Sequence, residues 1–169
     1  TSTLRESEKR YRELSDLLPQ TVFEMDEMGN LIFVNRGGFD IFGYTQDDFD
    51  KGLSALQMLV PEDRDRATKS IQRILSGEKF GGSEYTALRK DGRTFPVIIY
   101  TSPIIRENKP VGLRGIVVDI SERKRLEKKL AEAEGLAAIG ETAAMVGHDL
   151  RNPLQAIVGT LYLARKKLK

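Results

Sequence analysis

Residues 83–102 have the sequence SEYTALRKDGRTFPVIIYTS, and this stretch decides the fold. Two runs rich in β-branched and aromatic residues flank Lys90-Asp91-Gly92, which predicts strands over 83–89 and 93–102. Asp-Gly between two such runs is the strongest short hairpin signal, because glycine readily adopts the positive φ that a tight turn needs. The stretch therefore predicts an antiparallel pair of strands.

Three more strands are expected on either side of this hairpin. After a turn at 107–110, residues 111–120 predict a third strand on the C-terminal side. On the N-terminal side, alternating apolar residues predict strands over 21–25 and 31–34, joined by the turn at 26–30. Five strands are therefore expected in all.

Between the two groups of strands, residues 36–76 have a helical pattern that is broken into short pieces. The residues that break it are Gly43, Gly52 and Pro61. Two strands, short helices and three more strands predict an α+β fold with an antiparallel sheet packed on helices. Pro96 and Pro103 cannot donate to a sheet, so we expect them at an edge or an irregularity.

Helices are expected at both ends of the chain. Apolar residues at helical spacing over 3–18 predict a short amphipathic helix that Pro19 stops. Beyond Ser121, apolar residues at helical spacing form two successive series, which together make an apolar seam. They are Leu126, Leu130, Ala133 and Ala137, and then Leu136, Ile139, Ala143, Val146 and Leu150. The second series is offset by one residue near Gly135. Such a long apolar seam predicts a coiled-coil homodimer through 121–169, with packing on the chain's own α+β region as the alternative.

Composition excludes several classes of function. The chain has no cysteine and one histidine, which excludes disulfides and thiolate catalysis and disfavours a zinc site. Residues 1–120 carry 17 Lys and Arg against 19 Asp and Glu, whereas 121–169 carry 10 against 6. This modest excess predicts a solvated helix face and no nucleic-acid partner. No apolar run reaches the length of a membrane span, and we expect a cytoplasmic location.

The single histidine, His148, lies in the predicted C-terminal helix. At about 100° per residue it points away from the apolar seam, toward solvent. Its unperturbed pKa of about 6.5 makes the imidazole a neutral nucleophile near physiological pH. From position alone, a tolerated polar residue is the simpler interpretation; the residues that follow, Asp149-Leu150-Arg151-Asn152-Pro153, favour a functional one.

Several short motifs occur together over residues 8–122. They are Val34-Asn35 before Phe42-Gly43-Tyr44, Pro61-Glu62-Asp63-Arg64, Arg89-Lys90-Asp91-Gly92-Arg93, and the exit Asp119-Ile120-Ser121-Glu122-Arg123-Lys124. In this order they resemble a PAS domain, which implies a PAS-type five-stranded sheet. Gly37 and Gly38 replace a small non-glycine residue of the family, and Val60 replaces a common histidine; neither changes the fold assignment.

The segment 136–169 resembles the first helix of the dimerisation and phosphotransfer domain of sensor histidine kinases. His148 to Pro153 matches the phosphoacceptor box of that family at every position. The resemblance implies that His148 accepts the γ-phosphoryl group of ATP and that Asp149 accepts a hydrogen bond from it. It also implies that Asn152 positions water for hydrolysis of a phosphorylated response regulator.

Some roles within this box stay open. Neighbouring side chains diverge on a helix, so Asp149 is alternatively a solvated surface carboxylate. Asn152 is at i+4 and shares the face of His148. Pro153 either kinks the helix as a bending point for a signal or is a tolerated distortion. Arg151 either meets phosphate or faces water.

The resemblances divide the chain into four expected segments. They are an N-terminal amphipathic helix (1–18), a PAS sensor domain (19–120), a helical signal linker (121–135) and the first helix of the phosphoacceptor domain (136–169). An ATP-binding domain has no counterpart here, and no phosphate-binding glycine motif occurs. Because the chain starts at Thr1 and ends in a lysine-rich helix, we expect a piece of a longer protein. Because it lacks an ATP-binding domain, we expect this piece to be inactive alone.

The ligand of the PAS domain is not determined by its sequence. A haem sensor usually needs an axial histidine and a flavin-thiol photoreceptor needs a cysteine, and residues 1–120 have neither. Noncovalent flavin, a small metabolite and an empty core all remain open. Six side chains could line a pocket or be plain core: Phe23, Phe33, Phe42, Met58, Tyr85 and Tyr100.

These expectations combine into one leading function. The chain is expected to be the sensory and phosphoacceptor part of a cytoplasmic sensor histidine kinase, in which the PAS domain controls phosphorylation of His148. No cofactor is expected in these residues. Its partners would be a second copy, the ATP-binding domain of the same protein with ATP and Mg²⁺, and a response regulator receiver domain. The alternative is a PAS dimerisation or small-molecule-binding module with a helical tail and no phosphotransfer.

Overall fold

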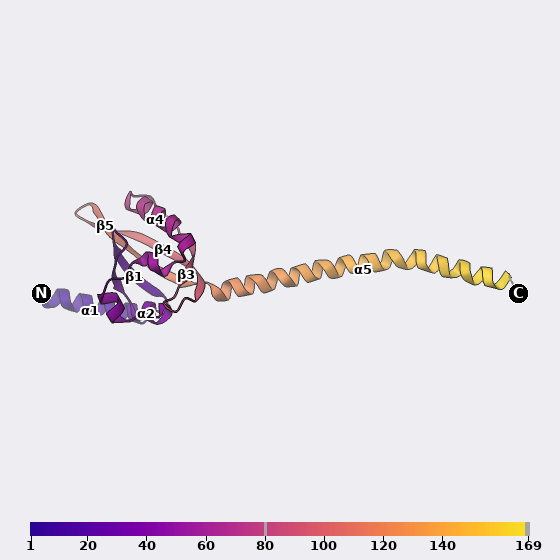
Figure 1. Ribbon diagram of the computed structural model, residues 1–169, viewed down its shortest axis with the longest axis horizontal. Helices are drawn as coiled ribbons and strands as arrows, with labels where there is room; N and C mark the ends of the chain where they lie inside the picture. Colours follow the sequence, from indigo (N-terminus) through magenta and orange to yellow (C-terminus); the bar gives the residue numbers. More distant parts are fainter. Residues whose placement is uncertain (80, 168–169) are drawn as a thin grey trace. The chain divides into compact units, whose positions relative to one another are not determined.

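The computed structural model describes the backbone of residues 1–79 and 81–167 and the side chains of residues 1–79 and 81–145. The chain forms two compact units, Thr1–Glu122 and Arg123–Lys169. Figure 1 shows the strands and the shorter helices gathered in the first unit. Among the described residues, no helix is long and apolar enough to cross a membrane.

The first unit is an α+β fold. Its helices are α1 (Ser2–Asp16), α2 (Arg36–Phe42), α3 (Gln46–Asp50), the 3₁₀ turn η1 (Ala55–Met58) and α4 (Pro61–Leu75). Its strands are β1 (Thr21–Asp26), β2 (Leu31–Val34), β3 (Ser83–Leu88), β4 (Thr94–Arg106) and β5 (Lys109–Asp119). The predicted antiparallel five-stranded sheet is confirmed, in the order β2-β1-β5-β4-β3.

The hairpin at Asp91-Gly92 forms as its sequence predicts. Gly92 has a φ of 86°, and the backbone NH of Arg89 donates to the carbonyl oxygen of Arg93 at 2.9 Å. The carboxylate of Asp91 accepts from the backbone NH of Arg93 at 3.0 Å. A glycine in the left-handed region thus ends a three-residue loop, a common hairpin type.

The second hairpin is tighter than predicted, and its strands are longer. Glu107 and Asn108 have φ values of 50° and 61°, so they form a two-residue turn with both central residues in the left-handed region. The strand predicted over 93–102 continues to Arg106, and the strand predicted from 111 begins at Lys109. The two prolines of β4 do not stop it.

Both prolines lie at or beyond the end of one of the two ladders that β4 forms. Pro96 pairs with Thr86 of β3, before the register of β4 with β5 begins at Val97. Pro103 pairs with Leu113 of β5, beyond the end of β3. The missing NH of Pro103 therefore costs no inter-strand bond, and Pro96 lies at the end of the β4–β5 ladder, where its carbonyl oxygen accepts from the NH of Ile120 at 3.0 Å. The expectation of an edge position is confirmed.

The hydrophobic core lies on the face of the sheet that packs against α2, η1 and α4. Alternate residues of the inner strands point there, among them Phe23, Val97 and Leu113, of which Val97 and Leu113 are fully buried. Ala67 and Ile74 of α4 cover them from the helical side. The breaks in the predicted helical stretch coincide with Gly43 and Gly52, which have positive φ, and with Pro61, which begins α4.

The last element is the helix α5 (Ser121–Lys167), which makes up the second unit from Arg123 onward. Its backbone is helical without a break through Gly135 and Pro153. The apolar side chains of the seam that the structure describes are exposed on this helix: Leu126, Leu130, Leu136 and Ile139. The seam residues Ala133, Ala137 and Ala143 are exposed as well, whereas the side chains of Val146 and Leu150 lie outside the described residues.

Candidate functional site

The first unit contains a cavity between the inner face of the sheet and the helices. Its volume is about 90 Å³. Side chains from all five strands and from α2, η1 and α4 line it, so only the completed fold encloses it. Four of the six predicted lining residues are present in its wall: Phe23, Phe42, Met58 and Tyr85.

Phe33 does not line the cavity, and the prediction for it was wrong. In the pairing of β1 with β2, Phe23 is opposite Val34 and Glu24 is opposite Phe33, but Met25 is opposite Leu31. Ile32 is therefore the extra residue of a β-bulge, which breaks the alternation of β2. The Phe33 ring is turned to the other face, where its centroid lies 5.5 Å from that of Tyr11.

Tyr100 is the second incorrect assignment. It is 50% exposed and pairs with Ile116, which is also exposed. Its neighbours in β4, Ile99 and Thr101, line the cavity. Strict alternation along β4 therefore turns Tyr100 outward, and that pattern was available in the sequence.

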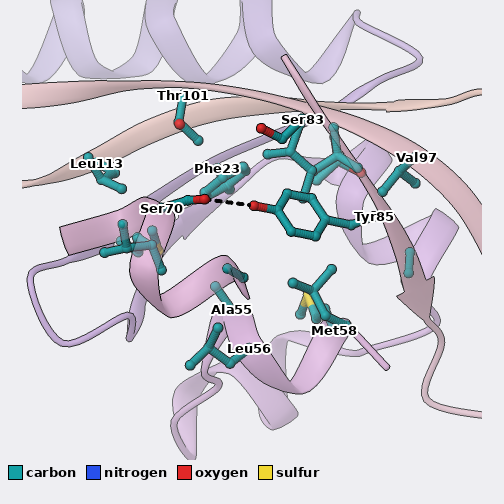
Figure 2. A pocket seen from close by; sticks show the side chains of 18 of the residues that line it. Phe23, Ala55, Leu56, Met58, Ser70, Ser83, Tyr85, Val97, Thr101 and Leu113 are labelled. Atoms are coloured by element: carbon teal, nitrogen blue, oxygen red, sulfur yellow. Dashed lines mark hydrogen bonds between the residues drawn. The ribbon is translucent and has the colours of Figure 1, made fainter. Parts of the chain in front are cut away.

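Apart from Tyr85, the residues that bring hydroxyl groups to the cavity wall were not predicted from the sequence. Figure 2 shows Ser70, Ser83, Tyr85 and Thr101 around one side of the cavity. The Tyr85 hydroxyl donates to the Ser70 hydroxyl at 3.2 Å. Thr21 also lines the cavity. Each strand residue among them lies two positions from an apolar residue that also faces the cavity. The alternation along the strand could therefore have predicted its place in the wall, although its residue type could not.

Arg66 lies over the outer side of this cluster. Its guanidinium carbon is 4.2 Å from the centroid of the Tyr85 ring. The same group is 2.9 Å from the Asp63 carboxylate and donates to the backbone oxygen of Glu84 at 2.8 Å. Burial raises the pKa of Asp63, but hydrogen bonds from the backbone NH of Thr86 and from Arg66 outweigh it, so the pKa is lowered overall.

A buried asparagine joins the N-terminal helix to the cavity wall. Asn35 is 1% exposed, and its side chain makes four hydrogen bonds. Its amide nitrogen donates to the carbonyl oxygens of Ser15 and Gln20, and its oxygen accepts from the backbone NH groups of Val22 and Gly38. All four of its hydrogen-bonding positions are therefore used.

An ion pair joins α3 to the β3–β4 hairpin. The Lys90 ammonium is 2.7 Å from the Asp48 carboxylate. Asp48 also closes a capping box with Thr45 at the start of α3. The hydrogen bond from Lys90, followed by that from the Thr45 backbone, lowers the pKa of Asp48 to about 2.

The predicted phosphoacceptor residues lie on α5. His148, Asp149 and Asn152 are all within its helical backbone, as predicted, but their side chains lie outside the described residues. At the end of the first unit, Asp119 accepts from the backbone NH of Ser121 at 2.8 Å, and the backbone NH of Ile120 donates to the carbonyl oxygen of Pro96 at 3.0 Å. Among the described residues, no group of carboxylates or histidines could hold a metal ion.

Comparison with known proteins gives consistent matches. Over nearly its whole length the chain is similar to sensor histidine kinases. It is 29% identical to sporulation kinase A of Bacillus subtilis, over 98% of this chain and 27% of that protein. It is 25% identical to the signal transduction histidine-protein kinase AtoS of Escherichia coli, over 98% of this chain and 28% of that protein. The chain thus spans little more than a quarter of these relatives.

The fold has close structural neighbours as well. The PAS domain of a protein from Colwellia psychrerythraea superimposes with a TM-score of 0.61 and 25% identity, covering 68% of this chain and 97% of that domain. The family model described as the PAS fold matches residues 31–117, from β2 to the end of β5. With this match over half of its length and the β2-β1-β5-β4-β3 sheet around a central cavity, the chain belongs to the PAS fold family, in the form found in sensor histidine kinases.

Proposed function

We propose that this chain is the sensory and phosphoacceptor part of a sensor histidine kinase. The observation that carries the proposal is the extent of the similarity to sporulation kinase A, which covers 98% of the chain and so includes α5 as well as the PAS domain. His148 lies on α5 within a phosphoacceptor box that is complete from His148 to Pro153. A PAS domain alone would not require that box.

The proposed reaction is phosphoryl transfer to His148. The neutral imidazole attacks the γ-phosphorus of ATP; a P–N bond forms, the bond to the β-phosphate oxygen breaks, and ADP leaves. Phosphoryl transfer depends chiefly on positioning and on stabilisation of charge, so a nucleophile on a stiff helix suits it. ATP and Mg²⁺ would be bound by an ATP-binding domain of the same protein, outside these 169 residues.

The neighbours of His148 have supporting roles in this proposal. Asp149 accepts a hydrogen bond from the imidazole and raises its nucleophilicity. Asn152 is one helical turn further on the same face and positions the water that later hydrolyses the phosphorylated receiver domain. His148 then passes its phosphoryl group to a receiver domain of a response regulator.

Dimerisation through 121–169 is the second part of the proposal. Leu130 and Leu136 are 60% and 70% exposed in the single chain, which leaves apolar surface that a second copy could bury. Two offset seams meet near Gly135, where an added Cβ would have no atom within 4 Å. If the state of the PAS domain selects one seam, the helix rotates and His148 turns toward or away from its ATP-binding domain. A cytoplasmic location is part of the same proposal.

Labelled phosphate tests the reaction directly. The full-length protein is incubated with γ-labelled ATP, and the 169-residue chain is supplied separately with the ATP-binding domain. Wild-type protein should acquire acid-labile label in both cases, and His148→Gln should acquire none. Asn152→Ala should still be labelled, because its role follows the transfer. An unlabelled full-length wild-type protein would contradict the kinase proposal and favour a PAS module without phosphotransfer.

A further inference from the structure

The sheet has an open edge along part of β4. β3 pairs with β4 only over residues 94–99, and β4 continues to Arg106 with β5 as its one partner strand among the described residues. Residues 100–106 therefore have no neighbouring strand on the side away from β5. Unpaired backbone groups along such an edge are a template for pairing with another chain.

The backbone groups of alternate β4 residues point to this open side. The carbonyl oxygen of Pro96 accepts from the backbone NH of Ile120, which lies on the β5 side. The NH and carbonyl groups of one residue in an antiparallel strand point to the same side, and those of the next residue point to the other side. The backbone groups of Thr101, Pro103 and Ile105 therefore point to the open edge.

The sequence of β4 is suited to pairing with a second copy of the chain. Residues 94–105 carry no charge, and residues 97–101 are all β-branched or aromatic. Uncharged segments of high β propensity are the ones that add to one another as strands. Two copies of one edge are also self-complementary, because antiparallel pairing about a two-fold axis brings the same residues from both copies together. A second copy is therefore the partner that this edge fits.

Pro103 interrupts the open edge. It has no NH, so any pairing of two β4 edges through this residue lacks one hydrogen bond from each copy. Within the folded chain the proline costs no hydrogen bond, because it pairs with Leu113 of β5 and its missing NH would point the other way. Proline on an edge strand is one of the devices that keep natural sheets from pairing with one another.

The other open stretches of the sheet are protected in different ways. At one end of the sheet, β2 has only four residues and contains a bulge, which leaves a short and irregular edge. At the other end, the outer side of β3 is bonded to the beginning of α4. The backbone NH of Thr86 donates to the Asp63 carboxylate at 2.7 Å. The carbonyl oxygen of Glu84 accepts from Arg66 at 2.8 Å. Pro103 thus protects a stretch of edge that neither of these devices covers.

We propose that Pro103 blocks edge-to-edge pairing of this sheet with the sheet of a second copy. The block has a consequence for assembly, because every copy carries the same edge. If two chains dimerise through α5, their dimer has two such edges, and pairing of those edges would join dimers into open chains. The block itself does not depend on phosphotransfer; only its value for a closed dimer rests on the proposed function.

Pro103→Val tests the block, because it restores an NH at the open edge and keeps an apolar side chain. The weight-average mass of the 169-residue chain is measured by sedimentation equilibrium over a concentration series. One restored hydrogen bond from each copy should raise the association constant of the edge about thirtyfold. At the same high concentration, the mass of the variant should therefore reach at least about twice that of wild type, whatever the oligomeric state of wild type.

A matched control and hydrogen exchange locate the new contact. Ser102→Val adds a similar side chain at a residue whose NH points toward β5, so its mass should equal that of wild type. In Pro103→Val, the backbone NH groups of Thr101 and Ile105 should exchange about tenfold more slowly at high than at low concentration, because they become donors to the second copy. Pro103→Thr should behave like Pro103→Val, so the result does not depend on a single variant.

Each contrary result overturns the proposal. A wild-type mass in both Pro103 variants would mean that the edge is not a pairing surface. A lower unfolding temperature in both would mean that Pro103 serves the fold itself. Equal association of Ser102→Val would assign the effect to apolar surface, and association without slower exchange at Thr101 and Ile105 would place the contact elsewhere.

The proposed phosphotransfer can be separated from this block. His148→Gln combined with Pro103→Val should associate like Pro103→Val alone, because the edge does not involve α5. Failure of His148 labelling would therefore leave the mass measurements unchanged, and failure of the mass measurements would leave the labelling unchanged.

Discussion

The side-chain nitrogen of Asn35 lies 2.7 Å from the carbonyl oxygen of Ser15, the last buried residue of α1. Twenty residues separate the two in sequence, yet this bond fixes the end of α1 beside the start of β1. Through its oxygen, Asn35 also binds the backbone NH of Val22, the residue after Thr21. Asn35 therefore ties the end of α1 to the first residues of β1.

Asn35→Ala should destabilise the protein strongly. It removes four hydrogen bonds and leaves the NH group of Val22 buried without a partner. We expect a loss of about 3 kcal/mol in the free energy of unfolding, measured by urea denaturation. Asn30→Ala is the matched control, since Asn30 is exposed and its side chain bonds only to Asp26; a loss above about 1 kcal/mol there would contradict the argument.

Gly112→Ala should also be destabilising, for a steric reason. An added Cβ would collide with the backbone carbonyl group of Met25 on the neighbouring strand β1, and neither strand can move without breaking its pairing. We expect a loss of about 2–3 kcal/mol, read from thermal or urea unfolding. Gly81→Ala has nothing within 4 Å of the added atom and should change stability by less than about 0.5 kcal/mol.

The Asp48–Lys90 ion pair should make stability depend on pH in the acid range. The hydrogen bond from Lys90 lowers the pKa of folded Asp48 to about 2, below its value in the unfolded chain. The unfolded chain therefore binds the proton first as the pH falls. The contribution of Asp48 is complete above about pH 4 and is lost progressively toward pH 2.

Urea unfolding at a series of pH values from 5 to 2 measures this effect. Asp48→Asn should have a flatter profile than wild type over that range, and Lys90→Met should flatten it in the same way because it removes the partner. If both variants kept the wild-type slope, the acid sensitivity would arise from other carboxylates.

Insertions at Gly135 should test whether the rotational phase of α5 carries the signal. One added residue rotates everything beyond it by about 100°, whereas seven added residues restore the direction to within about 20°. We expect a one-residue insertion in the full-length protein to change the rate of His148 phosphorylation severalfold and to make it independent of the PAS domain. The seven-residue insertion should preserve regulation; equal behaviour of both insertions would argue against rotation.

Local chemistry explains why much of the PAS domain could be predicted. The turn at Asp91-Gly92 separates two strands independently of tertiary contacts, because it needs only a glycine with positive φ. Gly43, Gly52 and Pro61 divide the helical stretch for similar reasons. The N-terminal helix, predicted to residue 18, ends at Asp16 because the residues before Pro19 are disfavoured in a helix.

The cavity could be predicted only in part. Phe23 and Tyr85 could be placed in the cavity wall because their strands alternate regularly. The same alternation would have placed Thr21 and Ser83 there. Phe33 could not be placed from its own strand, because the bulge at Ile32 exists only in the pairing of β2 with β1. Register is a property of two strands together.

By itself, the sequence determined the strands, their turns, the helical segments and the box around His148, because each depends on residues close together in the chain. Only the tertiary structure decided that Thr21 of β1 and Tyr85 of β3 share one cavity. They are 64 positions apart in the sequence, and the β2-β1-β5-β4-β3 order brings their strands into one sheet by placing β5 and β4 between them. The tertiary structure also leaves the Thr21 hydroxyl without a hydrogen-bond partner, because the folded sheet and helices determine which groups surround it.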